Sequence, residues 1–63
     1  MKRWHLHNVN NVAPVVFTYD FPDGDRVVLE SYGEPMFARV DLAEKLEALA
    51  AAATEAAKEL RGG

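Results

Sequence analysis

Hydrophobic and polar residues alternate on both sides of one turn signal near the middle of the chain. The stretch FPDGDR (residues 21–26) has proline, aspartate and glycine in the order of a type I turn followed by a bulge, which closes a tight hairpin. If Phe21 pairs with Asp25, the register of both strands is fixed. The pairs that follow are Tyr19 with Val27 and Phe17 with Leu29 on one face, and Asp20 with Arg26, Thr18 with Val28 and Val16 with Glu30 on the other. Apolar pairs on one face and an opposite-charge pair on the other predict an antiparallel hairpin.

A second alternating stretch precedes this hairpin. The sequence RWHLHNV (residues 3–9) has a period of two, which places Trp4 and Leu6 on one face of a strand and His5 and His7 on the other.

The chain between these two stretches predicts a turn and the start of a strand. Asn10-Asn11 is typical of a turn, and Pro14 is tolerated where a strand begins. We therefore predict strands at about 3–9, 14–21 and 26–32, joined as an antiparallel meander. Its covered face should carry Trp4, Leu6, Val15, Phe17, Tyr19, Phe21, Val27 and Leu29.

The C-terminal third of the chain predicts a helix. Asp41 with Glu44 three residues later has the form of a capping box, in which each side chain bonds a backbone amide at a helix start. The following residues are rich in alanine and contain neither proline nor glycine, so we predict a helix at about 42–61. The segment 36–40, after the break at 33–35, is open between a short fourth strand and an irregular lead into the helix, and we favour the strand.

The apolar positions of this helix recur in steps of four and three. They are Leu42, Leu46, Leu49, Ala53, Ala56 and Leu60, and they have the spacing of a heptad seam. A helix of this length extends roughly 30 Å, against about 20 Å for a strand of the hairpin, so its second half should project beyond the sheet. The fold class predicted is α+β: one domain over residues 1–63, with an antiparallel meander of three or four strands and one long C-terminal helix packed on one sheet face.

Length and composition favour an oligomer. A chain of 63 residues buries only about 60% of the surface that its unfolded form exposes. The chain has no cysteine, so disulfides cannot compensate. A homodimer is the commonest way to extend so small a core.

The charge of the chain argues against nucleic acid as a partner. The net charge is −3, and the one basic patch with an aromatic residue lies at Lys2, Arg3, Trp4 and His5. We favour a core position for Trp4 over base stacking. No apolar stretch is long enough for a signal peptide or a membrane span, so we expect a cytoplasmic protein with no membrane contact.

The residues of catalytic chemistry are scarce. Ser31 is the only serine, no nucleophile elbow surrounds it, and no glycine-rich loop opens a helix. His5 and His7 have the spacing of two zinc ligands, with Asp20 or Glu30 as a third, but nothing in the sequence fixes that third ligand. We therefore expect no enzyme, no cofactor and no metal site.

The last four residues, LRGG, have the letters of the conjugated tail of ubiquitin. Here they follow helical residues directly, and no strand pair follows the helix, as the ubiquitin topology requires. Glycine just after a helix is a common terminator, and Lys58 and Arg61 suit the negative end of the helix dipole. We predict a helix cap.

Two surfaces are candidates for binding. The helix seam consists of Leu46, Leu49, Ala53, Ala56 and Leu60, and the outer sheet face of His5, His7, Val9, Val16, Thr18, Val28 and Tyr32. An outer face with three valines and a tyrosine is less polar than one that meets only water.

These features predict a non-enzymatic protein–protein interaction module that forms a homodimer and binds a protein target. By analogy of size and charge alone, it would be a phage or mobile-element inhibitor of a host protein. One alternative is an oligomer that sequesters a small nucleotide or metabolite in a cleft between subunits, and another is a helix-zipper scaffold without a target. The cleft would be lined by residues among Trp4, His5, His7, Arg26, Tyr32 and Arg39.

Overall fold

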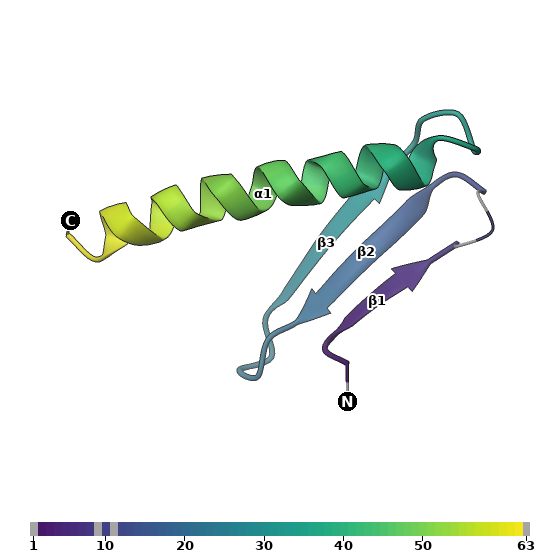
Figure 1. Cartoon of the computed structure of the whole chain (residues 1–63). Coiled ribbons are helices and arrows are strands. Elements are labelled where there is room, and N and C mark those ends of the chain that lie inside the picture. The colour runs from purple at the N-terminus through teal and green to yellow at the C-terminus, as the bar shows by residue number, and fades with distance from the viewer. Residues whose placement is uncertain (1, 9, 11, 63) are drawn as a thin grey trace.

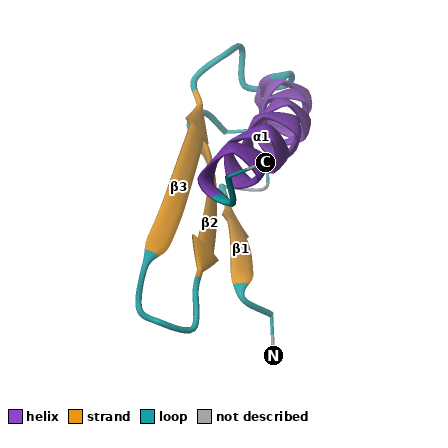
Figure 2. Ribbon diagram, turned by 90° about the vertical axis from the view of Figure 1, so that its left-hand side faces the viewer, coloured by secondary structure: helices purple, strands orange, loops and turns teal. Residues whose placement is uncertain are grey.

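Three antiparallel strands and one long helix make up the fold (Figure 1). The computed structural model describes residues 2–8, 10 and 12–62. The strands β1 (Trp4–His7), β2 (Val15–Asp20) and β3 (Arg26–Ser31) lie in the order β1-β2-β3, and α1 (Ala38–Leu60) follows. Seen along the sheet, α1 covers one face and leaves the other open (Figure 2). The predicted α+β class, a meander followed by one helix, is confirmed.

The register of the β2–β3 hairpin is the predicted one. The amide of Phe21 donates to the carbonyl of Asp25 at 2.9 Å. All five pairs expected beyond the turn are present, from Asp20–Arg26 to Val16–Glu30. Gly24 has φ +98°, a conformation that glycine adopts without steric cost. The turn sequence and the alternating pattern therefore specify the same register.

The first strand is shorter than predicted. β1 ends at His7 because Asn8 turns into the left-handed region with φ 59°, where its side-chain amide donates to the carbonyl of Pro14 at 2.5 Å. The predicted strand end at Val9 and the turn residue Asn11 lie outside the described residues.

The start of the helix corrects two predictions. Residues 36–40 form no fourth strand: 35–37 is a turn, and α1 begins at Ala38, one turn earlier than expected. The capping box is also wrong, because the N-cap is Phe37 and no side chain caps the helix. Asp41 instead lies in the first turn, where a carboxylate suits the helix dipole. A Cβ atom at Gly33 would overlap the Asp41 carboxylate, so the preceding loop passes close to that side chain.

The end of the helix agrees with the predicted cap. The amide of Arg61 donates to the carbonyl of Ala57 at 3.1 Å, and the amide of Gly62 donates to the carbonyl of Glu59 at 3.0 Å. Gly62 has φ +78°, the left-handed conformation usual just after a helix. Gly63 lies outside the described residues.

The core is small and lies at one end of the sheet. Among the described residues, the fully buried hydrophobic side chains are Val15, Ala38 and Leu42, and the side chains packed against them are Leu6, Phe17, Leu29 and Leu46. The molecule measures 42 × 24 × 15 Å with a radius of gyration of 13.6 Å. A compact chain of this length would have a radius of about 10.6 Å. The extended shape arises because α1 crosses the sheet at one end and continues beyond it (Figure 1).

Candidate protein-interaction site

An apolar wedge lies between the sheet and the helix, on the side of the hairpin turn. Its floor is the inner sheet face, and its roof is the middle of α1. The helix packs into the core through Ala38, Leu42 and Leu46 in its first half. The floor residues are Trp4, Leu6, Phe17, Tyr19, Phe21 and Val27, and the roof residues are Leu46, Leu49, Ala50 and Ala53. The helix was expected to cover these floor residues, and it covers only part of them: Trp4 is 42% exposed and Phe21 44%.

Aromatic contacts order the floor of the wedge. The rings of Trp4 and Phe17 stack with their centroids 6.0 Å apart, and Tyr19 meets Phe21 edge to face at 4.8 Å. The Nζ atom of Lys2 lies 4.9 Å from the centre of the Trp4 ring, in cation–π geometry. Trp4, which we expected in the core, therefore lies at the edge of the core. A preformed aromatic surface of this kind loses little side-chain entropy when another protein covers it.

The predicted helix seam divides into two parts. Leu46 packs against the core, whereas Leu49 is 40% exposed at the mouth of the wedge. Ala53 and Ala56 are exposed, and Leu60 is 89% exposed at the far end of α1. The structure thus brings the first half of the seam to the sheet and leaves the second half projecting from it (Figure 1).

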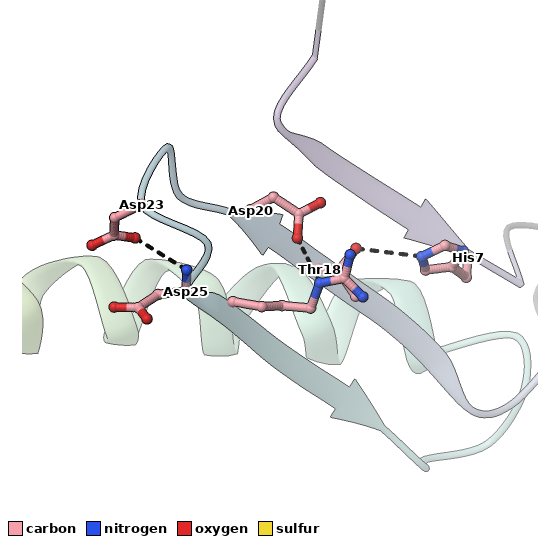
Figure 3. Close-up of polar contacts among 6 residues, drawn as sticks. His7, Thr18, Asp20, Asp23 and Asp25 are labelled. Carbon is pink, nitrogen blue, oxygen red and sulfur yellow. Dashed lines mark hydrogen bonds and ion pairs between the residues drawn. The ribbon is translucent and has the colours of Figure 1, made fainter.

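The outer sheet face carries the second set of predicted residues. His5, His7 and Tyr32 are exposed, Val16 is half-buried, and Val28 is 49% exposed. Thr18 is buried among its neighbours, and its Oγ1 lies 3.4 Å from Nε2 of His7 (Figure 3). Thr18 therefore supports this face and offers little contact surface itself. Val9, also predicted here, lies outside the described residues.

Two polar contacts define the charge of the outer face. Arg26 donates from Nε to Oδ1 of Asp20 at 2.5 Å, and this hydrogen bond holds the pKa of the Asp20 carboxyl below its ordinary value. The hydroxyl of Tyr32 donates to a carboxylate oxygen of Glu30, and this bond raises the pKa of Tyr32. Both acidic residues considered as third metal ligands are therefore engaged with other side chains.

His5 and His7 are neighbours on the outer face of β1. The rings of His5 and His7 lie 6.1 Å apart. In the part of the chain that the structure describes, no three side chains of the types His, Cys, Asp and Glu come together as a cation site.

A shallow groove beside the first strand carries the basic residues of the N-terminus. It is lined by Lys2, Arg3, His5, Asp20, Phe21 and Pro22. Of the residues proposed for a shared nucleotide cleft, His5 lines this groove, whereas Arg39 lines another between α1 and β1. The groove is positive through Lys2 and Arg3 but includes the Asp20 carboxylate.

The floor of the wedge is the part of the site that sequence reasoning missed. The alternation correctly placed Phe17, Tyr19 and Phe21 on the inner face, and we assigned that whole face to the core. The mismatch between a helix of about 30 Å and strands of about 20 Å indicated the projecting helix end. It did not indicate the crossing angle, which decides how much of the floor stays open.

Comparison with protein families, with curated proteins and with solved structures finds no match to this chain. Within the described residues, no helix is long and apolar enough to cross a membrane.

Proposed function

We propose that the protein is a non-enzymatic protein–protein interaction module whose apolar wedge is buried against another protein chain. Self-association is the form of this interaction that we expect first. The outer sheet face then remains open for a protein target.

The excess of exposed surface is the observation that carries this proposal. The chain exposes 4973 Å². A compact monomer of this mass would expose about 4,000 Å², so the surplus is roughly 900 Å². A protein–protein interface of ordinary size buries about 800 Å² on each partner. The surplus is therefore of the size that one interface would cover.

Solution mass tests the proposal directly. Light scattering over a dilution series of the full chain should show a dimer that dissociates on dilution. If the chain is monomeric throughout, the module should instead be recovered from a cell extract with a macromolecular partner. A chain that is monomeric at every concentration and recovers nothing would contradict the proposal.

An inhibitor of a host protein, such as a phage or mobile element encodes, is one form that this module would take. When a second copy covers the wedge, the target of such an inhibitor would meet the outer face. Val28→Lys places a charge on that face and should abolish recovery of the target without changing the solution mass, because burying an unpaired charge in an interface is costly. Recovery of the same target by Val28→Lys would exclude the outer face.

The groove of Lys2, Arg3 and His5 is the observation that supports a second function, binding of a small anionic nucleotide. A ligand that binds the folded state raises the melting temperature by mass action. ATP, tested with and without Mg²⁺, should then stabilise the protein, and Arg3→Ala should remove the effect. An unchanged melting temperature at millimolar ATP excludes this alternative.

A further inference from the structure

The lining of the wedge suits the apolar face of a helix. Its lining residues are aliphatic or aromatic, and the polar groups among their side chains are the Tyr19 hydroxyl and the Trp4 indole N–H. A charged or extended peptide would lose hydration there without gaining partners. The second half of α1 is a helix with an exposed seam of Ala53, Ala56 and Leu60 and with no contact to its own sheet near its end.

We propose that the wedge is filled by the second half of α1 from a second copy of this chain. The two helices run antiparallel around a two-fold axis near Ala52, and each helix end lies over the aromatic floor of the other chain. This inference rests on the proposed function, because it names the partner of the same surface.

Charge complementarity selects the alignment. Lys45 and Glu59 lie about four turns apart and so share one flank of the seam. Setting Lys45 of one copy opposite Glu59 of the other forms the same pair twice by symmetry. Lys45 donates to the carbonyl of Glu30 at 3.3 Å, and its ammonium group retains two further donors. A parallel alignment in register would instead place Glu55 and Glu59 beside their own copies.

Side-chain size agrees with this alignment. It sets Leu49 of one copy opposite the stretch from Ala53 to Ala56 of the other, and Leu46 opposite the stretch from Ala56 to Leu60. Leu46 and Leu49 therefore each meet alanines of the second half, which let the two backbones approach closely. Antiparallel packing also pairs the positive end of one helix dipole with the negative end of the other.

A single engineered cysteine tests the position of the axis, because the chain has none of its own. In Ala52→Cys the two thiols face each other across the axis, and mild oxidation of the full chain should give a covalent dimer. A disulfide requires Cα atoms about 5.5 Å apart. Ala51→Cys is the matched control, because Ala51 is also an exposed alanine but lies on the outward side of the seam. Equal cross-linking of both variants, or of neither, would overturn the alignment.

Charge reversal tests the pairing independently of any cross-link. Lys45→Glu and Glu59→Lys should each raise the dimer dissociation constant by about tenfold, since each replaces two attractive pairs with two repulsive ones. The double variant Lys45→Glu with Glu59→Lys should restore the wild-type constant. Circular dichroism checks that each variant is folded. Additive weakening in the double variant would overturn the pairing.

The outcomes separate this inference from the proposed function. If Val28→Lys dissociates the dimer and both charge reversals leave it unchanged, the dimer forms through the outer face. This inference and the proposed burial of the wedge then fail, while self-association of the module stands. If the chain is a monomer that recovers a different protein through the wedge, this inference fails and the proposed function stands. A monomer that recovers nothing overturns both.

Discussion

At the scale of single residues, the hydroxyl of Ser31 stands out because it is buried without a partner. Ser31 is fully buried at the end of β3, and its Oγ atom has no hydrogen-bond partner in the described part of the chain. A buried polar group without a partner loses its hydration and gains nothing in return. We therefore expect Ser31→Ala to raise the free energy of unfolding by roughly 1 kcal/mol. Urea denaturation measures this change, and a loss of stability would mean that the hydroxyl has a partner in solution.

The Asp20–Arg26 pair makes a pH-dependent contribution. The hydrogen bond from Arg26 lowers the pKa of Asp20 in the folded protein below 3.8, the value of a free side chain. A carboxyl with a lowered folded pKa stabilises the fold fully above that unfolded value, and the contribution is lost as the pH falls through the folded pKa.

Asp20→Asn should therefore lower the melting temperature slightly at pH 7, because the pair is solvent-exposed. At pH 2 the two proteins should melt closer together. Thermal melts of both across pH 2–7 measure the difference. A difference that grows as the pH falls would contradict the assigned direction of the pKa shift.

At the scale of elements, the attachment of α1 depends on one large side chain. Leu42 is 1% exposed and is the largest buried apolar residue in the core. Truncation of a buried leucine costs about 2–5 kcal/mol, which is a large part of the stability of so small a domain. We expect Leu42→Ala to unfold much of the population at 25 °C, as circular dichroism would show. Val40→Ala on the exposed side of α1 is the control and should change stability by less than about 0.5 kcal/mol.

The elements also show why some features follow from sequence and others do not. The hairpin was predictable in full because turn chemistry at residues 21–26 and alternation on both sides fix one register independently. The start of α1 was not, because Asp41 and Glu44 have the form of a capping box that the chain does not use. The helix begins at Ala38 instead. Ala38 is small enough to be fully buried in the core, so packing extends the helix by one turn. Propensity and capping patterns carry no information about such a contact.

At the scale of the whole molecule, the two halves of α1 differ in what holds them helical. The first half packs on the sheet through Leu42 and Leu46, whereas the end at Leu60 is 89% exposed. An isolated helix of so few residues is marginal in water, so the second half needs a surface to cover its seam. In a self-associating module a second chain provides that surface. The fraction of helix ends that are covered therefore depends on protein concentration.

Hydrogen exchange should therefore resolve the two halves. Amides of residues 53–60 should exchange through local fraying when the protein is dilute and become protected as the concentration rises, because association stabilises only the bound form. Amides of β2 and of residues 42–46 should remain protected by the core under both conditions and serve as the internal control. Mass spectrometry of exchanged peptides at two concentrations a hundredfold apart makes the comparison. Protection of residues 53–60 that is high and independent of concentration would show that the projecting helix is stable by itself, and it would remove the reason for a partner at this end of the molecule.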